Sequence, residues 1–284
     1  MKKIVLSTLI ASSLLMAYND DISDSESHTL IVNQTVVNDI ITAPIATTTS
    51  DLDSNNGSVA GQYIYSDKVN IINIPLSYNI NKNFTALMAL PIVSTTEEIG
   101  IGDISLGGSF NFGQMNKGVG LNVTTLRYKT STGDSKTGTG SGADAITLSH
   151  NINRAVGAGF IVNAIASYTS NFGEYTDEFD TTVSYGDAYL ALISAAHPCL
   201  LSNKVITNVK LSYIHNNDHD FNYSFGSFNA GETTNIDLWL AWTSSKIITG
   251  IPLAAGIKIP LLSEVNSVDD EKVYQFYVSI TGLY

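Results

Sequence analysis

The chain is poor in the residue types that several classes of protein require. It has a single cysteine, Cys199, which excludes an internal disulfide framework and a cysteine-based zinc site. Its 14 basic residues face 26 acidic ones, so a surface that neutralises nucleic-acid phosphates is not expected. Only 14% of the residues are charged, whereas globular chains carry about 25%. This shortage indicates that something other than water covers part of the protein, and the 44% hydrophobic content excludes disorder throughout.

Long apolar runs are also scarce, and the first of them is short. Residues 1–17 begin with Met1, Lys2 and Lys3, continue with apolar residues to Met16 and end at Ala17, which is the order of a cleaved secretory signal peptide. The run has about 14 residues, whereas a helix needs roughly 20 to cross the hydrocarbon. We therefore expect an exported chain without inner-membrane helices, whose formal net charge changes from -12 to -14 when both leader lysines are lost.

Residues 18–56 are rich in Asp, Ser, Thr and Asn, with one β-branched island at 30–37. This composition fits a polar, acidic periplasmic leader or a plug, and it fits a disordered tail equally well.

From Gly57 to Tyr284 the sequence alternates between apolar and polar residues. Ile72, Ile74 and Leu76 share one parity, whereas Asn73 and Ser77 take the other. A period of two predicts strands with one apolar and one polar face. The predicted strands span 57–66, 68–80, 84–93, 101–113, 118–130, 143–153, 155–168, 182–197, 204–215, 232–243, 247–260 and 271–284.

The links between these strands alternate between short turns and longer Gly, Asp and Ser-rich loops. An even number of antiparallel strands with this alternation is typical of an outer-membrane barrel. A secreted β-sandwich also alternates, but its strands are usually only about 5 or 6 residues long. We therefore expect residues 57–284 to form an all-β transmembrane antiparallel β-barrel of about 12 strands, within a range of about 10 to 14. The short turns would face the periplasm and the long loops the outside of the cell.

Several stretches of these strands and loops match a known family. Gly100–Ile104 is similar to a Gly-Leu-Gly-Asp-Ile motif, and Lys129–Asp134 to Lys-Leu-Pro-Thr-Gly-Asp, with Ser131 in place of Pro. The other matching stretches are 77–84, 90–93 and 139–144, with Asn79 in place of Gly. The chain thus resembles the outer-membrane protein family of the meta-pathway of phenol degradation over about residues 70–284. The resemblance implies a barrel that is proposed to pass small, often hydrophobic compounds.

Charged residues within the strands are candidates for lining the lumen. Asp103 has two interpretations: a lumen charge that selects solutes, or, preferably, a hydrogen-bond acceptor that holds an extracellular loop. The other candidates, assigned by their parity, are Asp144, Asp187 and Asp237, with Lys210 and Lys258 opposing them. Inward placement avoids a cost of roughly 2 to 4 kcal/mol for a base near the membrane midplane, and less for an acid. A narrow lumen with paired charges and an open, cation-favouring channel remain as alternatives.

Two long loops combine aromatic and acidic residues. Their rings are candidates for an apolar extracellular entry, or they pack on each other over the mouth. The rings are Phe172, Tyr175, Phe179, Phe221, Phe225 and Phe228. Acidic neighbours and the negative net charge predict an acidic lumen that favours neutral aromatic compounds or cations over anions.

Other chemistry is not expected. His215 and His219 are weak candidates for a metal site, because a loop does not fix their geometry. Residues 132–142 lack the Gly-Lys-Ser/Thr ending of a phosphate loop, and His150 has no nucleophile motif around it, so neither a cofactor nor catalysis is predicted. Two functions remain: passive transport of small, hydrophobic or aromatic solutes, and a structural or surface-interaction barrel with a filled lumen. The expected partners are a solute, the lipid bilayer and the outer-membrane assembly machinery.

Overall fold

The computed structural model describes residues 57–65, 70–81, 83–95, 98–112, 119–134, 139–156, 160–176, 182–202, 205–223, 226–248, 251–265, 268–269, 272 and 274–283. Within these ranges, the chain contains no helix that is both long and apolar enough to cross a membrane.

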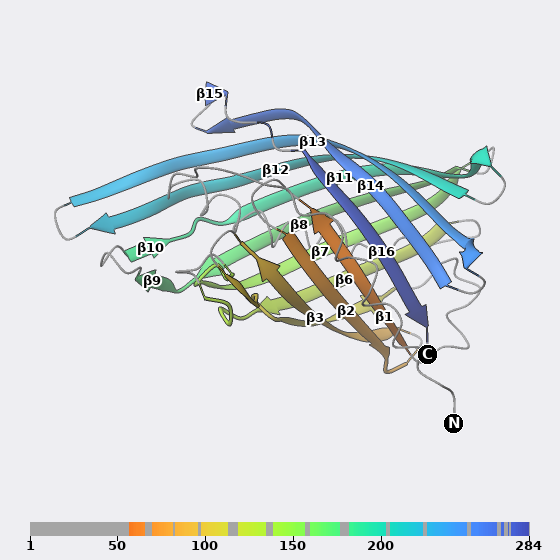
Figure 1. The fold of residues 1–284 in the computed structure, drawn as a ribbon, viewed down its shortest axis with the longest axis horizontal. Coiled ribbons are helices and arrows are strands. Elements are labelled where there is room, and N and C mark those ends of the chain that lie inside the picture. The colour runs from red at the N-terminus through yellow and green to blue at the C-terminus, as the bar shows by residue number, and fades with distance from the viewer. Residues whose placement is uncertain are drawn as a thin grey trace.

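Twelve strands form a closed antiparallel ring, so the prediction of an all-β antiparallel barrel of about 12 strands is confirmed. Each strand of the ring pairs with the next in chain order, and the first pairs with the last, with Ser58 opposite Leu283. The ring consists of β1 (Gly57–Tyr65), β2 (Asn70–Asn79), β3 (Phe84–Ser94), β5 (Ser105–Asn111), β6 (Val119–Lys129), β7 (Asp144–Val156), β8 (Phe160–Phe172), β11 (Ala188–Ser202), β12 (Val205–Tyr223), β13 (Gly226–Ile248), β14 (Ile251–Val265) and β16 (Gln275–Leu283). Figure 1 shows these strands side by side around one axis.

Among the described residues, four short strands lie outside the ring. They are β4 (Ile99–Ile101), which pairs with β3, β9 (Glu174–Thr176) and β10 (Thr182–Ser184), which pair with each other, and β15 (Val268–Asp269), which pairs with β14. β10 also pairs with the distal part of β12, which connects this small sheet to the barrel.

Alternation along the strands separates the inner face of the barrel from its outer face. In β12, Lys210 and Ser212 are buried inside, whereas Leu211 and Tyr213 between and beyond them are exposed on the outside. The same parity holds around the ring. Exposed large apolar side chains of the outer face include Tyr78, Ile80, Leu106, Phe110, Leu126, Leu148, Ile193, Phe276 and Val278. The outer surface is therefore apolar and the interior mixed polar and apolar, which is the reverse of a water-soluble barrel.

Several predicted segments end at different residues in the structure. The strand predicted at 101–113 is divided into β4 and β5. Between them, Gly102 and Ile104 form hydrogen bonds with Thr132. The turn predicted at residues 153–155 is instead strand. The register of β7 and β8 continues through Ala155 opposite Ile161 to Val156 opposite Phe160. At this hairpin, backbone pairing therefore continues beyond the residues that alternate between apolar and polar.

The predicted loop at residues 216–231 is also largely strand. β12 and β13 stay paired through Phe221 opposite Phe228 to Tyr223 opposite Gly226, with register shifts around His219. The hydrogen bonds between paired strands need no apolar face. Residues 216–220 are polar, so the alternation of apolar and polar residues does not reveal that the strands extend this far. In Figure 1 the two strands project beyond their neighbours at the end of the barrel where β9 and β10 lie. We call this the long-loop end, and the end near Asn81 and Leu283 the short-turn end.

Candidate functional site

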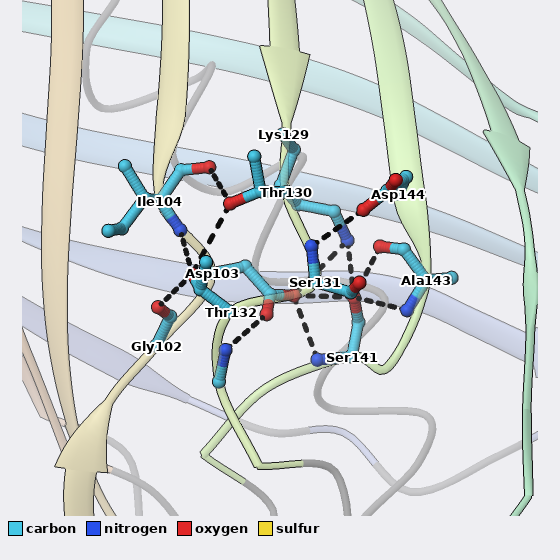
Figure 2. Close-up of polar contacts among 11 residues, drawn as sticks. Gly102, Asp103, Ile104, Lys129, Thr130, Ser131, Thr132, Ser141, Ala143 and Asp144 are labelled. Carbon is cyan, nitrogen blue, oxygen red and sulfur yellow. Dashed lines mark hydrogen bonds and ion pairs between the residues drawn. The ribbon is translucent and has the colours of Figure 1, made fainter.

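A cluster of polar contacts joins three chain segments at the long-loop end, beside β6. Asp103, between β4 and β5, accepts hydrogen bonds at Oδ1 from the Gly133 N–H, at 3.0 Å, and at Oδ2 from the Ser141 N–H, at 2.8 Å. The Ser141 hydroxyl also donates to Oδ2, and Lys129 Nζ lies 3.4 Å from the same oxygen (Figure 2). Both Asp103 and Lys129 are largely buried. The carboxylate therefore organises the loop after β6, as in the second interpretation of Asp103.

Threonines extend this cluster along the β4–β5 link. Thr132 Oγ1 accepts from the Ile104 N–H at 2.9 Å and donates to the Gly102 carbonyl at 3.1 Å. Thr130 donates from both its N–H and its hydroxyl to the Ile104 carbonyl (Figure 2). A Cβ on Gly102 would lie 2.8 Å from Val93 Cγ2, so only glycine allows this approach. We call Gly102–Ile104, Lys129–Gly133 and Ser141 the rim clasp.

Asp144 does not line the lumen, contrary to the prediction. It has the parity of Ile146 and Leu148, which are exposed on the outer face. Its Oδ2 accepts a hydrogen bond of 2.7 Å from the Tyr128 hydroxyl, and its Oδ1 accepts one of 2.7 Å from the Ser131 N–H. A rim carboxylate can be satisfied in this way by neighbouring donors, so the energetic argument for inward placement does not apply to it.

Asp187 is the second misplaced acid. It shares its parity with the exposed Tyr189, whereas Ala188 and Leu190 are buried on the inner face. Its Oδ2 accepts a hydrogen bond from the hydroxyl of Tyr168, another exposed residue of the outer face. Two acids predicted for the lumen therefore lie at the outer rim, each paired with a tyrosine of the preceding strand of the ring.

These tyrosines belong to an aromatic row on the outer face near the long-loop end. Tyr168 and Tyr189 have ring centroids 5.2 Å apart, and Tyr213 is stacked on His215 at 6.4 Å. Phe172, predicted to lie at the channel entry, stacks on Tyr128 at 6.1 Å and is 40% exposed. Phe172 therefore belongs to the outer face of the barrel and not to a vestibule over its mouth.

The other entry candidates are placed only in part. Tyr175 of β9 and Phe221 of β12 both lie opposite Val183 of β10, and Phe228 of β13 lies opposite Phe221. Phe179 and Phe225 lie outside the described residues. The backbone thus brings three of the six predicted positions together beyond the long-loop end.

Among the described residues, the interior contains the ion pair of Lys258 and Asp237 and a lysine, Lys210, without an acidic partner. Lys258 Nζ lies 3.9 Å from Asp237 Oδ2, and both side chains are largely buried. Lys210, 7% exposed, points inward from β12 and forms no ion pair within the described part of the chain. It lies opposite Ser194 of β11 and Trp239 of β13.

Trp239 is a functional candidate that the sequence analysis missed. It is 1% exposed, its Nε1 donates a hydrogen bond of 3.1 Å to Ser212 Oγ, and its ring centroid lies 6.2 Å from that of Tyr277. Its parity, shared with Asp237, already placed it on the polar face. Alternation assigns a residue to one face of a strand, but it does not reveal that two aromatic side chains of that face pack together.

Basic side chains outnumber acidic ones inside the described barrel. The inward-pointing bases are Arg127, Lys129, Lys210 and Lys258, and the corresponding acids are Asp103 and Asp237. Arg127 has the parity of the buried Lys129, and its Cγ would contact a Cβ on Gly107 of the neighbouring strand. The expectation of an acidic lumen is therefore wrong for this part of the chain, because the acids concentrate on the rim and in the loops.

The rest of the interior is closely packed. Apolar side chains form one cluster within it: Ile64, Ile71, Val93, Ile165, Ala188, Leu190, Leu192, Ile214, Trp239, Ala241 and Tyr277. Polar side chains surround the cluster, for example Asn73, whose Nδ2 donates to Gln62 Oε1 at 3.2 Å. These side chains are nearly all shielded from solvent, so they pack against one another inside the ring.

Of the two weak metal candidates, His215 and His219, the structure describes the side chain of His215 only. His215 Nδ1 lies 3.0 Å from Thr234 Oγ1, and its Nε2 lies 4.0 Å from Glu232 Oε2. Within the described ranges, no group of three or more His, Cys, Asp and Glu residues is arranged to hold a metal ion. His219 lies at a register shift of β12, opposite Gly231.

Comparisons with known proteins place the fold among outer-membrane barrels. Among solved structures, the chain is similar to the COG4313 outer membrane channel from Pseudomonas putida F1, with a TM-score of 0.63 and 11% identity over 80% of this chain and 94% of that one. It is also similar to the NanC porin, with a TM-score of 0.52 and 8% identity over 79% and 98% of the two chains. No protein-family model and no curated protein matches the sequence. At such low identity, the likeness shows the fold alone.

Proposed function

We propose that the chain is a non-enzymatic, narrow channel of the bacterial outer membrane through which small solutes pass passively. The observation that carries this proposal is the closed ring of strands with an apolar outer face and a charged inner face. An apolar band of this kind is costly in water and favourable in a lipid bilayer. The leader at residues 1–17 would direct export, and the assembly machinery of the outer membrane would insert the barrel.

Small hydrophobic or aromatic compounds are the solutes we propose. The similarity of Gly100–Ile104 and Lys129–Asp134 to the phenol meta-pathway family supports this class. These two stretches also form most of the rim clasp, in which Asp103 joins them through Lys129 and Gly133. The interior pair of Trp239 and Tyr277 adds apolar surface along the path.

The second candidate function is a structural or surface-interaction barrel. Its supporting observation is the near-complete burial of interior side chains such as Asn73, Ser212 and Trp239. Such packing leaves little room for a solute unless side chains move.

Cell fractionation and flux measurements test the two candidates. We expect the mature chain in the outer-membrane fraction, with faster electrophoretic migration unheated than boiled, because a closed barrel resists unfolding by detergent. Recovery as a soluble periplasmic protein would exclude the membrane channel. Proteoliposomes containing the folded protein should admit benzyl alcohol or benzamide faster than protein-free liposomes. A correctly inserted barrel without such flux would favour the surface-interaction function.

A further inference from the structure

Lys210 differs from Lys129 and Lys258, the two other largely buried lysines inside the described barrel. Lys129 is matched by Asp103 at 3.4 Å, and Lys258 by Asp237 at 3.9 Å. Lys210 is more than nine-tenths buried and has no acidic partner among the described residues. A buried charge without a counter-ion costs several kcal/mol, so a structure that keeps one favours an anion beside it.

The groups around Lys210 define what kind of anion fits. On β11, Ser194 lies opposite Lys210, and its hydroxyl can donate a hydrogen bond to an anionic oxygen. On β13, Trp239 lies opposite Lys210, with its indole N–H already bonded to Ser212. Trp239 therefore offers its apolar ring rather than a donor, and Ile214 and Tyr277 of the same buried cluster extend this apolar surface.

The charge balance limits the anion to one negative charge at this level. Asp237 already neutralises Lys258, and it lies opposite Ser212, one inward position along β12 from Lys210. A second negative charge on the solute would approach this carboxylate without a free cation to offset it. One ammonium group, one hydroxyl donor and adjacent rings match a monocarboxylate that carries an apolar body.

We propose that Lys210 binds the carboxylate of small organic monoanions, with Trp239 against their apolar part, as they pass through the barrel. This inference rests on the proposed channel function and names its class of solute. It also reverses the preference for neutral aromatic compounds or cations that is expected from the loop acids and from the net charge of -14 of the mature chain, since the described inner face carries few acids.

Benzoate and its neutral analogue benzamide test the proposal in the folded full-length barrel. The sequence has two tryptophans, so the Trp242→Phe variant leaves Trp239 as the sole fluorescent indole. In that background, benzoate should change the fluorescence of Trp239 at concentrations about tenfold lower than benzamide does, the expected effect of one hydrogen bond to a charged group. The additional change Lys210→Met should abolish this difference. Replacing a buried charge by an apolar side chain of similar length should preserve folding.

The matched control is Lys272→Met, which removes an exposed lysine that donates to the Leu261 carbonyl at 3.2 Å. This variant should retain the preference for benzoate. Equal affinities for benzoate and benzamide in the parent, or an unchanged preference in Lys210→Met, would overturn the assignment of Lys210.

Flux through proteoliposomes separates this inference from the channel function. Benzamide flux without a preference for benzoate would leave the channel intact and refute the anion site. Benzoate binding that depends on Lys210, without flux of either compound, would support the site and refute the channel.

Discussion

Lys129 Nζ lies 3.4 Å from Asp103 Oδ2, which joins the end of β6 to the link between β4 and β5. Ser141 donates hydrogen bonds to the same carboxylate from its N–H and from its hydroxyl. Three chain segments thus meet at a single, largely buried acid. A side chain whose parity suggests solute selection is therefore fully engaged in holding the rim of the barrel.

Removing this acid should loosen the rim clasp. Asp103→Ala leaves Lys129 buried without a counter-ion and two N–H groups without an acceptor, and breaking a buried pair in this way costs about 3 kcal/mol or more. We expect a lower urea midpoint of unfolding, followed by the electrophoretic shift, and faster proteolysis within residues 131–143. Glu98→Ala, at an exposed position of the preceding loop, is the control and should leave both measurements unchanged.

Arginine placed on the two faces of one strand should have different effects. Leu106 is 48% exposed on the outer face of β5, whereas the adjacent Ser105 has inward parity. Leu106→Arg places a charge against lipid at a cost of about 2 to 4 kcal/mol near the midplane, so insertion should fail more often than in Ser105→Arg. The same contrast should hold for Leu238→Arg and Asn235→Arg. Equal yields of heat-modifiable protein in each pair would show that the faces are wrongly assigned.

Gly256 allows the interior ring of Tyr277 to lie against β14. A Cβ at this position would be 2.3 Å from Tyr277 Cε1 and 2.7 Å from the Leu240 carbonyl oxygen, so Gly256→Ala must displace the ring or the strand. We expect a loss of about 1 to 3 kcal/mol in unfolding free energy and a change in Trp239 fluorescence, because Tyr277 contacts that indole. Gly61→Ala, where a Cβ would meet nothing within 4 Å, should not be destabilising. Similar losses in both variants would contradict the close packing described.

Aromatic residues of the long loops should differ in their effect on flux. Phe172 stacks on Tyr128 on the outer face, so Phe172→Ala should leave the uptake of benzyl alcohol unchanged. Phe221 and Phe228 are paired in the register of the projecting hairpin of β12 and β13, and we expect their joint replacement by Ala to slow this uptake. Both variants should still fold, so that each migrates faster on gels unheated than boiled. An unaltered rate in the double variant would remove the hairpin from the entry path.

Much of the architecture follows from the period of two. Positions such as Leu106, Phe276 and Val278 are exposed on the outer face, and Asp237 and Lys258 point inward, as their parity predicts. Strand pairing of this type needs only local alternation and turn residues, both of which a single sequence displays. The number of strands and their antiparallel order were therefore predictable.

The sequence by itself determined the closed barrel and its two faces, because every residue of a strand has one of two sides. Only the tertiary structure decided which charges meet. Asp144 and Asp187 lie at strand ends, where a tyrosine of the adjacent strand satisfies them on the outer side. Lys210 stands opposite Trp239 because β12 and β13 pair in one register. Register and the folding of loops onto the rim depend on contacts between distant segments, and parity carries no information about those.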